Sequence, residues 1–275
     1  MRIRIHHETT YSYQRPAQSV IQALRLTPRD HDGQYVWKWR VDVDFGGLSR
    51  PRDDAFGNIL HLLSGQGPIG SFTIAVDGEI ETTDTAGIVR GAAECFPPTL
   101  YLRETALTKP DENIVAFARS AMSDGGAGRL DILHRLLAAT HQHLVFDIGP
   151  TDATTTAALA FGIGRGVCQD LSHVFIAAAR SLGIPCRYVG GYLLRSDGTI
   201  QQEAGHAWAE AYLPDLGWIG FDPANGISPT DAYIRVAVGL DYLGAAPVRG
   251  AQFGGAAESL NVAVTVAQAT SQRQD

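Results

Sequence analysis

Three side chains of the types that form a thiol-based acyl-transfer site occur in order along this chain: Cys168, His206 and Asp222. A cysteine thiolate can attack a carbonyl, a histidine can exchange the proton of the reaction, and an aspartate can orient the histidine ring. Each residue alone has an ordinary structural explanation. Free cysteine is often buried in the core, and a histidine or an aspartate often only forms hydrogen bonds with neighbouring groups. Their combination on elements expected to lie together favours a catalytic triad.

An apolar stripe after Cys168 predicts an amphipathic helix. Its members recur at spacings of three and four: Leu171, Val174, Phe175, Ala178 and Leu182. Gly183 and Pro185 end the helix, and Gly164 and Gly166 allow a sharp turn before it. Cys168 is therefore expected in or just before the first turn. There the free backbone N–H groups and the positive dipole end favour a thiolate, and the amide of Cys168 can face an oxyanion.

His206 and Asp222 lie on two consecutive strand-like segments that predict a β-hairpin. In the first segment, 205–213, small apolar side chains alternate with larger ones, and His206 belongs to the larger set. With a simple four-residue loop, Asp222 would lie opposite Ala209, on the face away from His206. A bulge at Gly217, a common companion of a type I turn, would move Asp222 to the His206 face. An assembled triad therefore requires a bulged hairpin.

The segments that carry these residues resemble the transglutaminase-like superfamily, and more closely its bacterial branch described as cysteine proteases. The core segments of the resemblance are residues 165–173, 182–192, 205–208 and 217–223. The strand-rich leading domain and the tail of that branch are similar to residues 7–13, 24–29, 54–58, 234–242 and 247–250. The resemblance implies a triad carried by Cys168, His206 and Asp222, with no required metal or organic cofactor.

The expected fold class is α+β, with an N-terminal antiparallel β domain followed by a papain-like, transglutaminase-like core. In that core, helices precede an antiparallel sheet and the nucleophile lies at a helix N-terminus. The predicted division is a β-rich domain at 1–85, a linker at 86–100, the catalytic core at 101–228, and a C-terminal extension at 229–275 that packs back and frays at its end. Strands are expected at 2–6, 36–45, 59–63, 72–80 and 259–266, and further helices at 113–122, 130–143 and 155–161.

Five residues near the triad are candidates for substrate binding: Asp170, His173, Tyr192, Trp208 and Trp218. The first two follow the nucleophile on its helix, and the three aromatic residues could line an acyl-binding groove. The structural alternatives are a helix cap for Asp170, a surface histidine for His173, and plain core for the aromatic residues.

Eukaryotic transglutaminases use an upstream tryptophan to help bind the oxyanion, but this chain has no tryptophan between Trp39 and Trp208. Three residues in the corresponding region are candidates for the second oxyanion donor: His141, Gln142 and His143. The two histidines could also ligate zinc with Asp147, but they lack a second ligand pair at metal spacing, so no metal site is predicted. Acidic clusters of the kind that bind activating calcium are also not visible.

The composition is that of an ordinary soluble enzyme. The 275 residues are 45% apolar and 19% charged, and the net charge of -7 without a Lys/Arg block argues against nucleic acid or anionic membrane partners. Without a run of about 18 apolar residues or an apolar leader, we expect a cytoplasmic location. The three cysteines form no CxxC pair and make no disulfide framework. Cys95 and Cys186 are expected to be buried structural thiols, because free cysteine is among the most buried residue types.

The sequence therefore predicts a bacterial cysteine enzyme that forms an acyl-thioester from an amide of a protein or peptide substrate. Hydrolysis of that thioester is the favoured outcome, and no oligomeric state is predicted. Three alternatives remain open: transfer of a glutamine acyl group to an amine, acyl transfer from a thioester donor as in arylamine N-acetyltransferases, and a non-catalytic binding module. The triad does not separate hydrolysis from amine transfer, because both begin with the same half-reaction.

Overall fold

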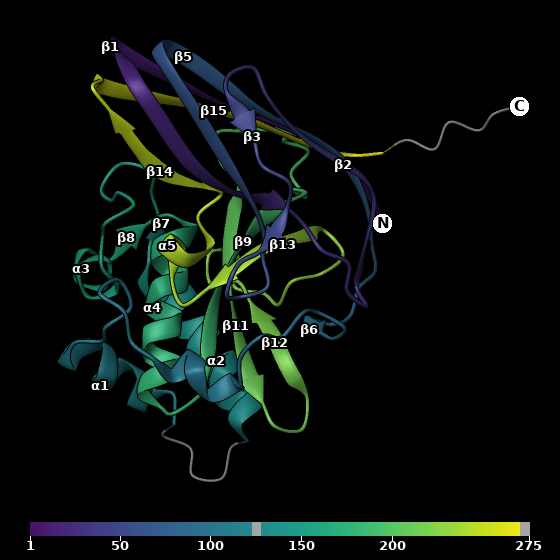
Figure 1. Cartoon of the computed structure of the whole chain (residues 1–275). Coiled ribbons are helices and arrows are strands. Elements are labelled where there is room, and N and C mark those ends of the chain that lie inside the picture. Colours follow the sequence, from purple (N-terminus) through teal and green to yellow (C-terminus); the bar gives the residue numbers. More distant parts are fainter. Residues whose placement is uncertain (123–127, 270–275) are drawn as a thin grey trace, which may run out of the picture.

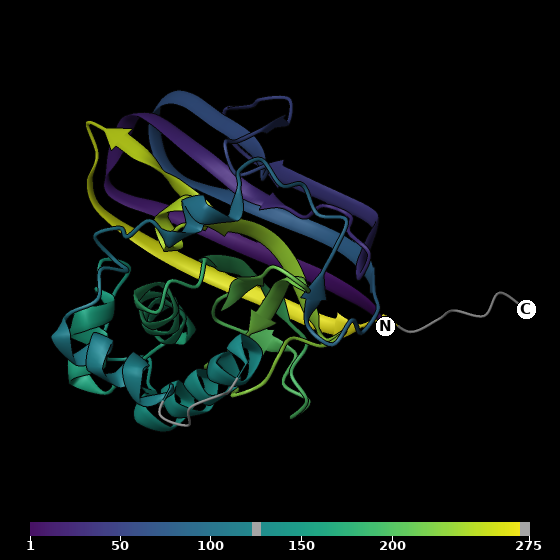
Figure 2. The ribbon, with the colours of Figure 1, turned by 90° about the horizontal axis from the view of Figure 1, so that it is seen from below.

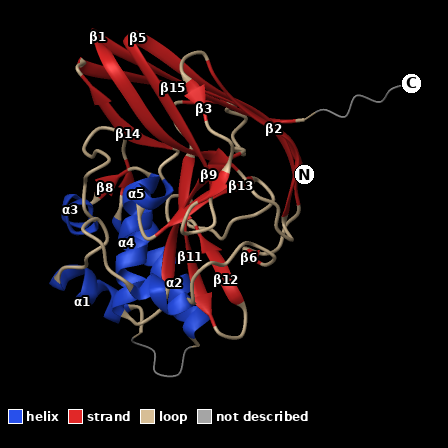
Figure 3. Ribbon diagram, viewed as in Figure 1, coloured by secondary structure: helices blue, strands red, loops and turns tan. Residues whose placement is uncertain are grey.

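The computed structural model describes residues 1–122 and 128–269 and arranges them as two antiparallel sheets with helices beside the smaller one. The long strands form the upper part of the molecule in Figure 1, and the helices gather below them on one side. The same segregation of strands and helices is clear in Figure 3. The predicted α+β fold class is confirmed.

The larger sheet is built on two long strands, β1 (Arg2–Thr27) and β5 (Ile59–Thr82), which pair antiparallel. Buried and exposed side chains alternate from Arg2 to Thr9, as expected for a half-buried strand. The strand expected at 2–6 is therefore only the beginning of β1. Beyond Ser12 the register of β1 against β5 shifts, and such irregularities allow a strand to bend. β1 therefore continues past the point where its alternation of buried and exposed side chains ends.

Further strands extend the larger sheet at both sides. β2 (Gln34–Val43) pairs with β5, and β15 (Ala256–Gln268) and β14 (Val248–Phe253) both pair with β1. Three short strands complete the sheet within the described residues: β3 (Gly47–Leu48), β4 (Arg52–Asp53) and β10 (Gln201–Gln202). The strand expected at 259–266 is confirmed as part of β15, which brings the end of the described chain beside its beginning (Figure 2).

The smaller sheet carries the predicted hairpin. Its strands, in spatial order, are β13 (Tyr233–Gly239), β9 (Cys186–Leu193), β11 (His206–Leu213), β12 (Gly217–Phe221) and β6 (Ile88–Val89). β6 comes from the segment predicted as a linker, and β13 comes from the segment predicted as a C-terminal extension. Segments from both sides of the predicted core therefore join the sheet that holds His206.

Helices cover one face of this sheet, and α4 (Cys168–Ser181) is the central one. The other helical elements are η1 (Pro98–Leu102), α1 (Glu112–Ser120), α2 (Arg129–His143), α3 (Ala157–Ile163) and α5 (Tyr242–Ala245). The helices expected at 113–122, 130–143 and 155–161 are confirmed with small differences at their ends. A parallel pair of short strands, β7 (Val145–Phe146) and β8 (Arg165–Gly166), lies just before α4.

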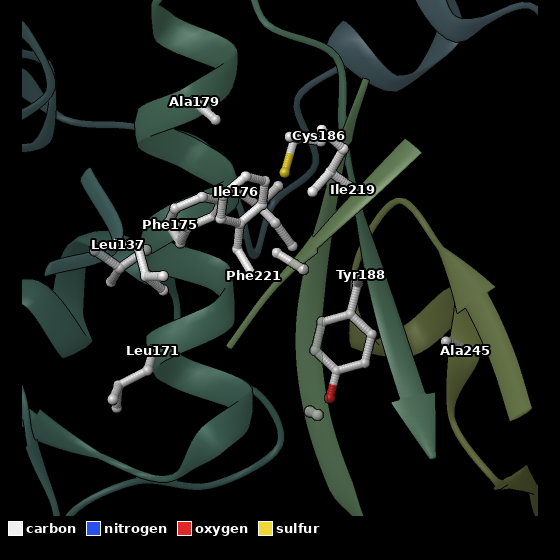
Figure 4. Close-up of a cluster of buried hydrophobic side chains, with 14 of the residues drawn as sticks. Leu137, Leu171, Phe175, Ile176, Ala179, Cys186, Tyr188, Ile219, Phe221 and Ala245 are labelled. Atoms are coloured by element: carbon white, nitrogen blue, oxygen red, sulfur yellow. The ribbon is translucent and has the colours of Figure 1, made fainter. Parts of the chain in front are cut away.

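The core around α4 fixes the position of the nucleophile. Phe175 and Ile176 are fully buried, and Figure 4 shows them facing Phe221 of β12 and Cys186 of β9. The rings of Phe175 and Phe221 stack with their centroids 5.3 Å apart. Burial of each such side chain contributes about 1.5–3 kcal/mol, so α4 is anchored along most of its length. Among the described helices, none has the length and hydropathy needed to cross a membrane.

Candidate active site

Cys168 is the first residue of α4, as the sequence predicts, and its side chain is half-buried. The Asp170 carboxylate caps the helix, because its Oδ2 accepts from the Val167 N–H at 2.9 Å and from the Thr151 hydroxyl at 2.7 Å. Gly166 leaves room for this cap, since a Cβ there would lie 2.6 Å from Asp170 Oδ2. The backbone before the nucleophile is thus held by a side chain of its own helix.

The hairpin that carries His206 has a register that places Asp222 on the His206 face, but β11 and β12 pair without the bulge that was expected at Gly217. Leu213 pairs with Gly217, and counting back along both strands pairs Ala209 with Phe221. Asp222 therefore follows on the face that His206 shares. Gly217 has φ of +85°, a left-handed conformation suited to glycine after a type I turn. One residue of register decides which face Asp222 occupies, because successive side chains alternate between faces.

His206 and Asp222 form a close pair at the open end of this hairpin. His206 Nε2 donates to Asp222 Oδ2 at 2.6 Å, which leaves Nδ1 for a second partner. The Asp222 side chain is fully buried and that of His206 is 11% exposed. The second carboxylate oxygen of Asp222 accepts from the backbone N–H of Ala224 at 2.9 Å and of Asn225 at 3.3 Å.

The electrostatics of the pair favour a charged imidazole. Burial alone would lower the pKa of His206, but the hydrogen bond and charge of Asp222, with a further interaction from Cys168, raise it to about 10. Burial would raise the pKa of Asp222, but its bonds to His206, Tyr233 and Asn225 hold it below its usual range. At neutral pH the site can therefore hold an imidazolium beside the Asp222 carboxylate, and Cys168 also interacts with that ring.

Two residues that sequence reasoning missed complete the surroundings of Asp222. Asn225 Nδ2 and the Tyr233 hydroxyl each donate to Asp222 Oδ2 at 2.7 Å. For Asn225 a signal exists, because an Asp-Pro-Ala-Asn-Gly segment is typical of a turn that folds back on the Asp side chain. Tyr233 lies on β13, beyond the predicted core, and no local pattern links it to Asp222.

The five candidates for substrate binding are all buried: Asp170, His173, Tyr192, Trp208 and Trp218. His173 is fully buried and not a surface residue as its structural alternative supposed. Its Nε2 accepts from the Tyr242 N–H at 3.0 Å, and burial lowers its pKa to about 4, so the ring is neutral. Asp170 serves as the helix cap already described.

The three aromatic candidates pack in different directions. The Tyr192 hydroxyl lies 2.9 Å from His7 Nδ1 of β1, which links the smaller sheet to the larger one. Trp208 packs edge-on against Tyr233, with ring centroids 5.4 Å apart. Trp218 lies beneath the guanidinium of Arg187. The groove-lining role of these side chains stays a prediction.

Of the candidates for the second oxyanion donor, His141 is bound elsewhere: its Nδ1 lies 3.0 Å from the Pro223 carbonyl oxygen. His143 Nε2 lies 3.2 Å from the Phe161 carbonyl oxygen, and its ring stacks on Phe161. Gln142 is exposed. Over 1–122 and 128–269, no three His, Cys, Asp or Glu side chains gather as ligands for one metal ion.

A buried ion network holds the strands behind the hairpin. Glu210 accepts from Arg187 at 2.7 Å and from Arg235 at 2.8 Å, and Arg187 also donates to Glu94 at 2.8 Å. The Arg187 guanidinium lies 3.8 Å from the ring centroid of Trp218. Burial alone would raise the pKa of Glu210, but the charges of Arg235 and Arg187 lower it to about 2. Glu210 is therefore ionised, and its charge joins β9, β11 and β13.

Comparison with known proteins assigns both halves of the chain. Residues 117–223 match the family described as Transglutaminase-like superfamily, and residues 3–81 match the Bacterial transglutaminase-like N-terminal region. An uncharacterized protein of Mycobacterium leprae is 30% identical, with 96% of this chain and 98% of the relative covered. A solved structure from Cytophaga hutchinsonii named "Putative Cysteine Protease" has a TM-score of 0.77 at 19% identity, covering 99% of this chain and 92% of that one.

A further relative matches over a shorter stretch of the chain. A Pseudomonas aeruginosa protein named "Protein-glutamine gamma-glutamyltransferase" is 28% identical over 109 residues, which are 37% of this chain and 16% of that protein. The chain thus spans a small part of that relative.

Proposed function

We propose a function for this chain on the basis that it belongs to the transglutaminase-like superfamily. It is a cysteine enzyme that cleaves amide bonds of a protein or peptide substrate through an acyl-thioester intermediate. The observation that carries the proposal is the buried 2.6 Å pair of His206 and Asp222, with Cys168 acting on the same imidazole from the first turn of α4. Nucleophile, base and orienting group thus converge from a helix and a hairpin.

In the proposed first half-reaction, the Cys168 thiolate attacks the amide carbon, and the carbonyl oxygen becomes an oxyanion that the free N–H of Cys168 faces. The C–N bond then breaks as His206 gives its proton to the leaving amine. The products are a free amine, a neutral His206 and an acyl group in thioester linkage to Cys168. Asp222 keeps its charge throughout and holds the ring in place.

In the second half-reaction, water attacks the thioester while His206 takes one of its protons. The C–S bond breaks, a carboxylic acid leaves, and the thiolate and imidazolium are restored. Attack by an amine in place of water would make the same chain a transglutaminase. The similarity to a protein named as a glutamyltransferase supports that second candidate. Hydrolysis is preferred because water is the default acceptor at an open site.

The test of the proposal is the pH dependence of iodoacetamide alkylation at Cys168, followed by peptide mass mapping in the wild type and in His206→Ala. We expect Cys168 to react well below pH 8.5, the ordinary pKa of a thiol being about 8.5, and to lose this advantage in His206→Ala. Cys95, which was expected to be a buried structural thiol, is exposed instead and serves as the internal reference. If Cys168 reacts no faster than Cys95 at pH 6 in the wild type, the enzyme proposal fails and a binding module is favoured.

A second assay separates the two outcomes of the thioester. A glutamine-rich protein is offered with a labelled primary amine, and label uptake is compared with release of peptide fragments or of ammonia without label. Fragments or deamidated glutamine without label support hydrolysis, whereas label that depends on Cys168 supports amine transfer. The Cys168→Ala variant is the matched control.

A further inference from the structure

The Asp222 carboxylate accepts a hydrogen bond from Tyr233, which lies on a different segment of the chain. Tyr233 on β13 is 7% exposed, and its hydroxyl donates to Asp222 Oδ2 at 2.7 Å. The same oxygen accepts from His206 at 2.6 Å and from Asn225 at 2.7 Å. The Tyr233 ring also packs against the ring of His206, with centroids 5.8 Å apart. The Tyr233 side chain therefore contacts both His206 and Asp222.

We propose that Tyr233 is a positioning residue that fixes the Asp222 carboxylate in the orientation and the ionised state that His206 requires. A carboxylate with no exposed surface depends on protein donors to stay charged, because water does not reach it. Tyr233 supplies such a donor from outside the turn that carries Asp222. This inference rests on the proposed thiol chemistry and deepens it.

The position of Tyr233 is in turn set by the larger sheet. β13 is the edge strand of the smaller sheet, and side-chain amides from the N-terminal part of the chain occupy its open edge. The Gln34 amide accepts from the Arg235 N–H and donates to the Arg235 carbonyl, both at 2.9 Å. In the same way, the Asn58 amide accepts from the Val238 N–H at 2.7 Å and donates to the Val238 carbonyl at 2.8 Å.

These two amides imitate the hydrogen bonds of a neighbouring strand. Each offers one donor and one acceptor to a single residue of β13, which is what a paired strand would offer. Gln34 and Asn58 are 3% and 4% exposed, so their bonds are shielded from water. The N-terminal β domain therefore acts as a part of the thiol site, because it holds the strand that carries Tyr233.

Titratable side chains from two helices also face the pair of His206 and Asp222. Cys168 approaches from α4, and His141 of α2 lies nearby, its Nδ1 on the Pro223 carbonyl. Burial raises the pKa of the Tyr233 hydroxyl, and the Asp222 charge raises it further, so Tyr233 stays a proton donor throughout the working range. A change in the pH profile after loss of this hydroxyl is then attributable to Asp222 and His206.

The experiment compares Tyr233→Phe with Tyr11→Phe in the full chain, using the alkylation rate of Cys168 from pH 4 to 10. Tyr11 is a buried tyrosine of the larger sheet that stacks on Phe72, so it controls for loss of a buried hydroxyl. We expect Tyr233→Phe to react about 3–10-fold more slowly at pH 6 and Tyr11→Phe to overlay the wild type. The midpoint of thermal unfolding is measured for each variant.

A purely structural role for Tyr233 would lower the unfolding midpoint and leave the pH profile unchanged. That result, in a folded Tyr233→Phe, overturns the inference. If Tyr233→Phe does not fold, Gln34→Ala decides, because it loosens β13 and leaves the triad side chains in place. A slower reaction at pH 6 supports the inference, and a profile that overlays the wild type overturns it. A wild type without a His206-dependent profile refutes the proposed function itself, which keeps the two failures distinct.

Discussion

Replacement of Asp222 by asparagine tests the electrostatic account of the site most directly. A rise in the pKa of His206 from 6.5 to about 10 corresponds to about 5 kcal/mol of preference for the protonated ring. Asp222 provides the largest favourable contribution and Cys168 a smaller one, while burial opposes both. Asp222→Asn keeps the shape of the side chain and removes the charge. The pKa of His206 is therefore expected to fall below 7.

The same substitution also creates a hydrogen-bonding conflict. Every partner of the Asp222 carboxylate is a donor: two backbone N–H groups at one oxygen, and the side chains of His206, Asn225 and Tyr233 at the other. An asparagine must turn its NH₂ group toward one of these sets. A buried donor left facing donors costs about 1–3 kcal/mol, so the free energy of unfolding should fall by about that amount.

The assay for Asp222→Asn is again Cys168 alkylation against pH, combined with urea denaturation at pH 7. We expect the rate at pH 6 to fall about 10–100-fold and the profile to approach that of an ordinary thiol with pKa about 8.5. Asp215→Asn, at an exposed position in the turn of the same hairpin, is the matched control. If Asp222→Asn keeps the wild-type profile, the imidazolium does not depend on the Asp222 charge and the reasoning is refuted.

Three further substitutions test the elements that position Cys168, His206 and Asp222. Gly166→Ala places a Cβ 2.6 Å from the Asp170 carboxylate and should cost about 1–3 kcal/mol of unfolding free energy in urea; a change below about 0.5 kcal/mol would show that the cap is not needed. Gly217→Ala puts a Cβ on a residue with φ of +85° and should lower the thermal midpoint through about 1 kcal/mol of strain, whereas Gly217→Asn should cost less. Glu210→Gln leaves Arg187 without its buried partner and should cost about 3 kcal/mol at pH 7. Because the pKa of Glu210 is lowered from 4.5 to about 2, its contribution is present above pH 4.5 and lost as pH falls toward 2, so the deficit of the variant should shrink over that range in acid titrations of stability.

The sequence alone determined the local framework of this protein. The apolar stripe from Leu171 to Leu182 and the glycines before Cys168 are local signals, because helix periodicity and chain turns depend on residues a few positions apart. The alternation around His206 and the Gly217 turn likewise predict a hairpin. The resemblance of the motifs identified the superfamily, which the comparisons confirm.

The register of that hairpin was not decided by local pattern. Both a simple and a bulged loop satisfy the alternation, and they differ only in the face that Asp222 occupies. The tertiary structure has neither form: Leu213 pairs with Gly217, one residue earlier than in the simple loop, and the two strands then pair without a register shift. A register is fixed when one face of a strand must be buried, and here α4 covers the face that carries the alanines of β11.

Only the tertiary structure decided which distant segments complete the site. β13 and β6 join the smaller sheet from outside the predicted core, β15 returns to pair with β1, and Tyr233 reaches Asp222 from β13. The Gln34 amide that holds β13 lies 201 positions before its partner in the chain. Such pairings arise because buried polar groups and open sheet edges must find partners wherever the fold provides them. That requirement acts through space, and no periodicity in a window of the sequence records it.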